Sequence, residues 1–108
     1  ITLITDRDMV IAVAGGPRKD YLEKHVGSLV EQAMENRKTA TETNPGTYDI
    51  IKDVRDTYTG FVIAPIVAGG DPIGSVILLS KDEGVKMGEL EIKMAETGAG
   101  FLAKQMEQ

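Results

Sequence analysis

The stretch YTGFVIAPIVAGGDPIGSVILL, residues 58–79, decides the fold. Two nearly continuous apolar runs, residues 58–67 and 72–79, are separated by a four-residue link whose two glycines tolerate positive φ. This pattern predicts a hairpin of two central strands. Pro65 has no N–H for a ladder hydrogen bond, so it marks a bulge or an unpaired side within the first strand.

Four further strands are predicted on the N-terminal side of this hairpin. Residues 1–5 and 9–14 are rich in β-branched side chains and are joined by a short polar link, which predicts a hairpin at the start of the chain. Residues 39–43 alternate threonine with alanine and glutamate, which is typical of a polar edge strand. The charge of Glu42 discourages pairing with a further strand. Residues 48–54 predict a moderately apolar strand.

Three helices are predicted. The first is short and spans residues 17–24. The second begins at Leu29, because Ser28 and Glu31 have the spacing of a capping box, and it ends near residue 38. The third spans residues 88–108, with acidic residues at its start and a lysine near its end.

The predicted order is strand, strand, helix, helix, four strands and a helix. It defines an α+β fold in which helices cover a mostly antiparallel sheet of five to six strands. The 108 residues are expected to form one domain, and no internal repeat or low-complexity tract interrupts them. The chain begins at Ile1 within a predicted strand, so we expect it to be a fragment of a longer protein.

Composition excludes several function classes. The chain has no cysteine and one histidine, which excludes disulfides, thiolate nucleophiles, cysteine-bound zinc and any site that needs two imidazoles. Its formal net charge of -5 repels phosphate backbones, so this segment is not expected to bind nucleic acid. No membrane span or signal peptide is apparent, which indicates a cytoplasmic location. We expect no metal and no cofactor.

The last helix has more apolar surface than one sheet can cover. On a helical wheel its apolar side chains form two lobes that subtend about 200°, whereas a helix on one sheet needs a stripe of about 100°. We therefore predict a homo-oligomer in which this helix meets a partner subunit or a helix outside the chain. The candidate interface consists of Leu90, Met94, Ala95, Ala99, Phe101, Leu102 and Met106. The alternative is that the first two helices wrap the last one within the monomer.

A small-molecule site is a second candidate. Aromatic and cationic side chains gather in the sequence before the central hairpin, as in an apolar pocket with a few polar groups. The candidate ligand residues are Tyr48, Lys52, Arg55, Tyr58 and Phe61. The alternative is that the aromatic rings only pack the sheet against the helices. Catalysis ranks last, since only Asp49, Asp53 and Arg55 lie near this stretch and His25 is expected to have a structural role.

Four segments carry a resemblance to a known family. They are DRDMVIAVAG at residues 6–15, KDYL at 19–22, APIVAGGDPIGSV at 64–76 and GFLAKQMEQ at 100–108. With them the chain resembles, from end to end, the C-terminal GAF domain of the stage V sporulation protein T family of transcription regulators. The resemblance implies a GAF-like, and hence PAS-like, fold for residues 1–108.

The resemblance also implies a function. In that family an N-terminal swapped-hairpin DNA-binding domain and a linking helix precede the GAF domain, and both are absent from this chain. DNA binding would then reside in the absent part, while this domain assembles subunits and sets the arrangement of the DNA-binding domains. A small molecule, of unknown identity, is the expected ligand of a sensing GAF domain; assembly without a ligand is the alternative. The absence of cysteine excludes covalent bilin binding.

Overall fold

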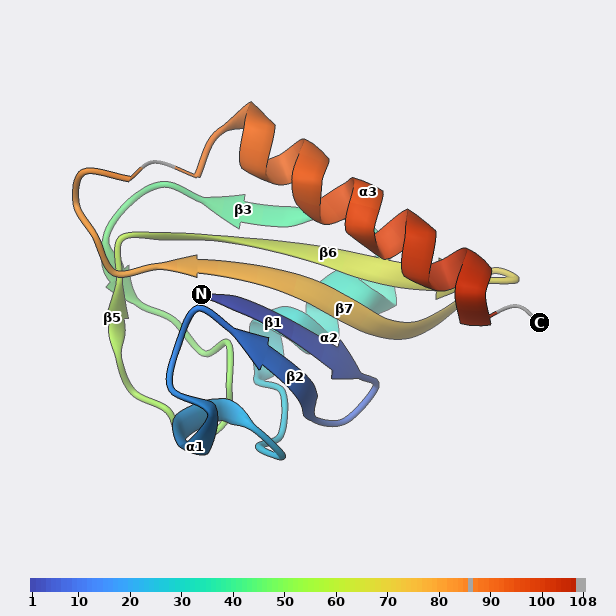
Figure 1. Cartoon of the computed structure of the whole chain (residues 1–108), viewed down its shortest axis with the longest axis horizontal. Helices are drawn as coiled ribbons and strands as arrows, with labels where there is room; N and C mark the ends of the chain where they lie inside the picture. The colour runs from blue at the N-terminus through green and yellow to red at the C-terminus, as the bar shows by residue number, and fades with distance from the viewer. Residues whose placement is uncertain (86, 107–108) are drawn as a thin grey trace.

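The computed structural model describes residues 1–85 and 87–106 (Figure 1). The last two residues of the third predicted helix lie outside the described residues. In chain order the elements are β1 (Thr2–Asp6), β2 (Val10–Ala14), α1 (Arg18–Tyr21), α2 (Ser28–Asn36), β3 (Ala40–Glu42), β4 (Gly46–Thr47), β5 (Thr57–Tyr58), β6 (Gly60–Ala68), β7 (Asp71–Ser80) and α3 (Glu89–Met106).

Five strands form one sheet in the order β2-β1-β7-β6-β3, and every neighbouring pair is antiparallel. β4 and β5 form a separate two-stranded ribbon. The predicted α+β class, the opening hairpin and the polar strand at the sheet's edge are confirmed.

The central hairpin is also confirmed. Gly69 and Gly70 form its two-residue turn with φ values of 60° and 85°. Positive φ at both central residues is what a type I′ turn requires, and the twist of that turn matches the twist of the flanking strands. Residues other than glycine rarely adopt this backbone conformation, which explains why two glycines occupy the turn.

Pro65 lies on an unpaired side of β6. Leu79 exchanges backbone hydrogen bonds with Ile1, so alternate residues of β7, including Ser75, direct their backbone polar groups toward β1. Pro65 is opposite Ser75 and therefore directs its own polar groups away from β7, toward the β3 side. β3 pairs only as far as Ile63, so no neighbouring strand in the sheet needs an N–H from Pro65.

The sheet lies between α2 and α3. Along β6, Phe61 and Ile63 join the buried cluster on the α2 side, whereas Val62 and Ala64 join the cluster on the α3 side. Because both faces of β6 and β7 are covered, these strands have nearly continuous apolar sequences. Figure 1 shows α3 running obliquely across one face of the sheet, with α2 behind it.

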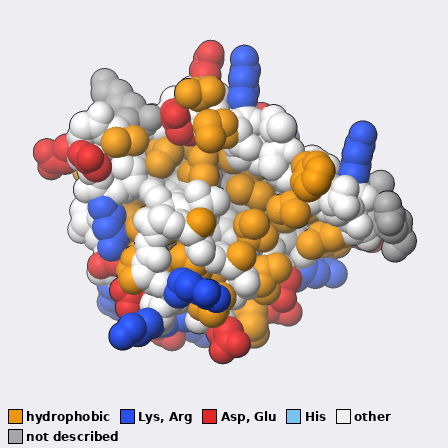
Figure 2. All heavy atoms as spheres, in the orientation of Figure 1, with side chains coloured by type: hydrophobic (Ala, Val, Ile, Leu, Met, Phe, Trp, Pro, Cys, Tyr) orange, Lys and Arg blue, Asp and Glu red, His pale blue; other side chains and the backbone are white. Residues whose placement is uncertain are grey.

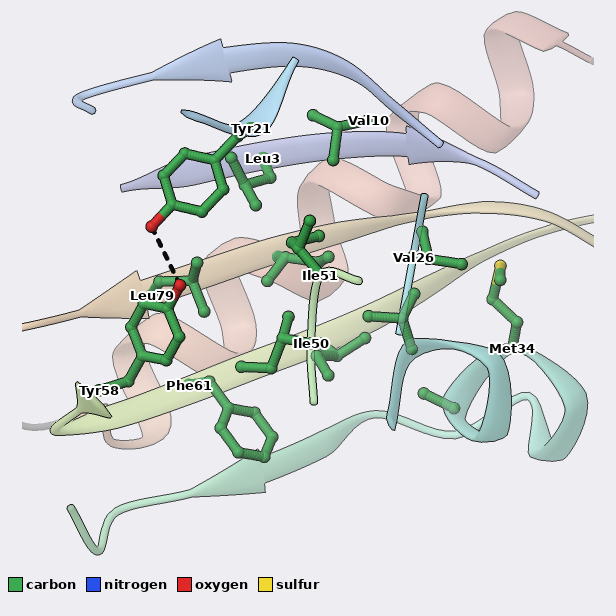
Figure 3. Packing of buried hydrophobic residues seen from close by; sticks show 14 residues of the cluster. Leu3, Val10, Tyr21, Val26, Met34, Ile50, Ile51, Tyr58, Phe61 and Leu79 are labelled. Atoms are coloured by element: carbon green, nitrogen blue, oxygen red, sulfur yellow. Dashed lines mark hydrogen bonds between the residues drawn. The ribbon is translucent and has the colours of Figure 1, made fainter. Parts of the chain in front are cut away.

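The α2-side cluster is the main core of the domain (Figure 3). It packs large, fully buried side chains from both hairpins against α2 and against the segment between β4 and β5. Within it the hydroxyl groups of Tyr21 and Tyr58 are hydrogen bonded at 3.0 Å. Among the described residues no buried side-chain polar atom lacks a partner, so this core is fully satisfied.

The predicted strand over residues 48–54 is wrong. Ile51 makes only an isolated bridge with Val26, and Asp53 turns the chain with a φ of 68°. Asp49 instead binds the start of α2: its Oδ2 accepts a hydrogen bond from the Ser28 N–H at 3.0 Å. Its carbonyl oxygen accepts a second from the Leu29 N–H at 3.1 Å. This segment therefore caps a helix rather than extending the sheet.

The predicted capping box is wrong for the same reason. The N-cap of α2 is Gly27, which has no side chain to donate or accept, and Asp49 supplies the carboxylate. A Cβ on Gly27 would lie 2.5 Å from the Asp49 carbonyl oxygen, so only glycine allows this approach. The first helix is also shorter than predicted. α1 is a single turn because the backbone of Glu23 and Lys24 bonds to Val10 instead.

We expect Asp49→Ala to lower the free energy of unfolding by about 1 kcal/mol at pH 7, the usual cost of losing a helix cap. The hydrogen bonds from Ser28 hold the pKa of the Asp49 carboxyl below its ordinary value. Stabilisation by a carboxyl of lowered pKa is present above the ordinary pKa and is lost as the pH falls through the lowered one. Urea denaturation should therefore show a gap between wild type and variant at pH 7 that narrows below about pH 4.

The control is Asp20→Ala, which removes an exposed carboxylate for which the structure shows no hydrogen-bond partner. Superimposable urea curves for wild type and Asp49→Ala at pH 7 would contradict the capping role.

Candidate functional site

The outward face of α3 is apolar and exposed. Leu90, Met94 and Phe101 are 65%, 59% and 61% exposed, and the exposed Thr97 lies between the last two. Their positions are separated by four, three and four residues, which is the spacing of a coiled-coil seam. Met106, at the end of the helix, is also exposed. Figure 2 views this side of the molecule and shows hydrophobic side chains gathered on α3 and on the sheet beside it.

The inward face of α3 is a narrow stripe of small side chains. Ala95, Ala99 and Ala103 are buried against β6 and β7, and Ile92 and Leu102 are partly buried on either side of them. Alanine methyl groups let the helix lie close to the sheet. The predicted interface is corrected accordingly: Ala95 and Ala99 pack within the chain, and Leu102 packs largely within it.

The alternative in which the first two helices wrap the last one is wrong. α2 contributes Val30, Ala33 and Met34 to the cluster on the opposite side of the sheet. Tyr21 of α1 belongs to the same cluster. Within the described residues no helix covers the outward face of α3. The apolar surface continues onto the sheet, where Ile4, Ile73 and Leu78 are only partly buried.

Charge is distributed unevenly along α3. Glu89 and Glu91 lie in its first turn, and Lys104 lies in its last. The Glu91 carboxylate also accepts a hydrogen bond from the Gly88 N–H at 2.8 Å, which caps the helix. The predicted complement to the helix dipole is therefore present at both ends.

The candidate ligand residues do not gather around one cavity. Tyr58 and Phe61 are buried in the core, where the Phe61 ring meets the Tyr48 ring edge-on with centroids 4.9 Å apart. The Tyr48 hydroxyl donates to the Asn44 carbonyl oxygen at 2.6 Å. Lys52 and Arg55 are exposed, and of the five only Lys52 lines a cleft that the structure shows.

A lysine ammonium group lies over the ring of Tyr58, the buried tyrosine that is hydrogen bonded to Tyr21. Lys81 Nζ lies 5.7 Å from the centre of the Tyr58 ring and 2.8 Å from Asp56 Oδ2. The hydrogen bond to Asp56 raises the pKa of the Lys81 ammonium, and burial raises the pKa of the Tyr58 hydroxyl. Both groups therefore keep their protons at neutral pH. The cluster stabilises the packing of the core and does not offer a ligand site.

A cleft of about 830 Å³ lies on the α2 side of the sheet. It is bounded by the β1–β2 turn, the bridged segments at residues 25–26 and 51–52, the outer side of α2 and the β6–β7 turn. Residue-by-residue interpretation of the sequence missed this cleft, because its lining comes from five separate stretches of the chain.

The structure offers no assembled catalytic or metal centre in the part of the chain that it describes. Among these residues no group of three His, Asp or Glu side chains lies close enough to hold a metal ion. Asp49 caps α2, Asp53 lies in a turn and Arg55 is exposed. The three polar residues considered for catalysis therefore have separate structural environments and do not form one site. His25 is exposed at the rim of the cleft. No helix in the described ranges is long and apolar enough to cross a membrane.

Solved structures define the class of this fold. The GAF domain of a phosphoenolpyruvate-protein phosphotransferase from Coxiella burnetii is similar with a TM-score of 0.73 and 18% identity, over 97% of this chain and 70% of that one. A type II free methionine-R-sulfoxide reductase from Thermoplasma acidophilum gives a TM-score of 0.71 and 14% identity, over 95% and 75% of the two chains. The domain thus has the GAF fold, as the resemblance implied.

Sequence comparison identifies the family within this class. The family described as "Stage V sporulation protein T C-terminal, transcription factor" matches residues 1–107. Stage V sporulation protein T of Bacillus subtilis (strain 168) is 44% identical over 106 residues, which are 98% of this chain and 58% of the relative. The chain therefore belongs to the stage V sporulation protein T C-terminal family. It spans less than two thirds of the length of this curated relative.

Proposed function

We propose that this domain is the regulatory assembly domain of a sporulation transcription regulator, and that two copies associate through the outward face of α3. The observation that carries the proposal is the exposed seam of Leu90, Met94 and Phe101 at coiled-coil spacing. An apolar seam of this kind is typical of a protein-protein contact. Family membership supplies the regulatory context.

Charge favours an antiparallel pair of α3 helices. In that arrangement Glu89 in the first turn of one helix approaches Lys104 in the last turn of the other, and the helix dipoles oppose each other. A parallel pair would place the two Glu89 side chains near each other. Gly98 lies close to the midpoint of α3, and nothing within 4 Å would meet a Cβ there, which leaves room for a second helix to cross.

Such an interface would act on DNA indirectly. The domain's acidic charge disfavours its own contact with phosphates, whereas a fixed pairing of two copies would set the distance and direction of attached DNA-binding domains. In this role the domain needs no catalytic group, and it works in the cytoplasm beside the DNA.

The orientation is tested by exchanging charges. At low ionic strength we expect Lys104→Glu to weaken self-association about threefold, because exposed ion pairs contribute roughly 0.2–1 kcal/mol. Adding Glu89→Lys should restore it, since the double variant pairs the same charges in reverse. Sedimentation equilibrium measures both. A double variant that associates as weakly as the two single changes predict together would contradict the antiparallel arrangement.

Small-molecule sensing is the second candidate. It is favoured by the cleft on the α2 side, which Lys52 of the predicted ligand residues lines. A ligand would regulate the assembly only by binding its two states with different affinity. Assembly without a ligand remains the competing hypothesis, and the ligand class argued below separates the two.

A further inference from the structure

The cleft on the α2 side has a basic wall built from three chain segments. Arg7 comes from the β1–β2 turn, His25 from the segment before α2, and Lys52 from the segment after Ile51. Backbone hydrogen bonds tie these segments together: the Val26 N–H donates to the Asp8 carbonyl oxygen at 2.9 Å and the Lys52 N–H to the His25 carbonyl oxygen at 2.8 Å. The wall is thus a fixed part of the fold.

The other wall is acidic and helical. Glu31 and Glu35 are four residues apart on α2, so they lie one above the other on the same side of the helix. Arg37 closes this end of the cleft with its backbone in the left-handed region. Its Nε donates to the Gly70 carbonyl oxygen at 2.8 Å and its Nη1 to the Glu35 carbonyl oxygen at 3.0 Å.

The charges of the two walls do not neutralise one another directly. Within residues 1–85 and 87–106 the one ion pair joins Lys81 and Asp56, neither of which lines the cleft. The side chains of Arg7, Lys52, Glu31 and Glu35 make no hydrogen bond that the structure shows. They therefore remain available to a charged ligand, and of the four Lys52 also interacts electrostatically with the Asp49 carboxylate.

Between the walls the floor is apolar. Val26 and Met34 are 4% and 6% exposed, and the buried Pro72 lines the cleft as well. Asp8 and Asp71 also line the cleft, so its four carboxylates face the three cations of Arg7, Arg37 and Lys52. A lining so close to balance suits neither a polyanion such as a nucleotide nor a polycation.

We propose that this cleft binds a short zwitterionic peptide. The peptide's ammonium group lies against Glu31 and Glu35, its carboxylate against Arg7 and Lys52, and an apolar side chain on Val26 and Met34. The volume of about 830 Å³ is ample for a ligand of two to three residues. This inference rests on the sensing role given above as the second candidate function, and it is independent of assembly through α3, on the other side of the sheet.

The test is a chemical-shift titration of the ¹⁵N-labelled domain with alanyl-leucine, alanyl-valine and leucyl-leucine. Each peptide is compared with its N-acetyl form, which lacks the cation, and its C-amide form, which lacks the anion. We expect shifts centred on residues 7–8, 25–26, 31–37 and 52. Removing either terminal charge should weaken binding about tenfold, which corresponds to about 1.4 kcal/mol.

Two variants assign the walls. Glu35→Gln should weaken binding of the free peptide and the C-amide but not of the N-acetyl form, because only the first two carry an ammonium group. Lys52→Gln should weaken the free peptide and the N-acetyl form but not the C-amide. Lys93→Gln, on exposed α3, is the matched control and should change none of them.

Three results would overturn the inference: no shifts with any peptide at about 10 mM, where a site with a Kd near 1 mM is about nine-tenths filled; equal binding of free and capped peptides; or shifts centred elsewhere. Self-association is measured in the same samples. Loss of peptide binding with intact association removes this inference alone, whereas absent association with intact binding removes only the assembly proposal.

Discussion

Phe101→Asp is expected to abolish self-association of the domain while leaving the melting temperature of the monomer, measured at a concentration too low for association, unchanged. The ring is 61% exposed, so a carboxylate at this position stays hydrated in the monomer. In a helix pair the same carboxylate is buried without a partner. We expect a loss of at least about 2 kcal/mol, or about thirtyfold in the association constant, as for a central interface residue. Sedimentation equilibrium and thermal melting measure the two effects separately.

The control for this change is Ile11→Asp. Ile11 is 47% exposed on β2, so it is another large apolar side chain at the surface, away from α3. Its replacement should leave association unaltered. A Phe101→Asp variant that associates as strongly as the wild type would exclude the α3 seam as the interface.

Gly74→Ala is expected to destabilise the domain by about 3 kcal/mol, the upper end of the usual cost of overpacking. Gly74 lies in β7 between Asp6 of β1 and Ile66 of β6, and an added Cβ would collide with the backbone carbonyl oxygen of Thr5. Beside it the hydroxyl groups of Thr5 and Ser75 form a buried hydrogen bond of 2.6 Å that holds the two strands together. The backbone therefore has no room to move aside, and urea denaturation should show the loss.

The same substitution at Gly100 should have the opposite sign. Nothing lies within 4 Å of a Cβ added there, in the exposed middle of α3. Replacing glycine by alanine inside a helix adds about 0.5–1 kcal/mol of stability. If Gly74→Ala were as stable as Gly100→Ala, the close approach of β1 to β7 would not limit this position.

Local pattern was sufficient to predict the strands that form the centre of the sheet. Residues 58–67 and 72–79 are two nearly continuous apolar runs joined by a four-residue link that contains a glycine pair, so few arrangements other than a buried hairpin suit them. The same holds for α3, whose apolar excess predicted an uncovered face that the structure shows at Leu90, Met94 and Phe101.

The features that the sequence pattern did not predict depend on contacts between residues far apart in the chain. Asp49 caps a helix that begins 21 residues earlier, and nothing in its own neighbourhood of the sequence reveals that partner. The sequence around Tyr58 is compatible with either a ligand pocket or the core. The hydrogen bond from Tyr58 to Tyr21, which lies 37 residues away, places this side chain in the core. On α3 a helical wheel does not distinguish the alanines that touch the sheet from those that would touch a partner.

Pro65 has a consequence for how crowded copies of this domain behave. β6 continues past the end of β3, so this part of the strand has no neighbour on that side of the sheet, and an unpaired strand edge is where one protein molecule templates another into a cross-β fibril. Because Pro65 presents a ring methylene where an incoming chain would seek a donor, such growth is interrupted at its first step. If two copies pair through α3 as proposed, this proline would hinder them from polymerising through their strands at high local concentration.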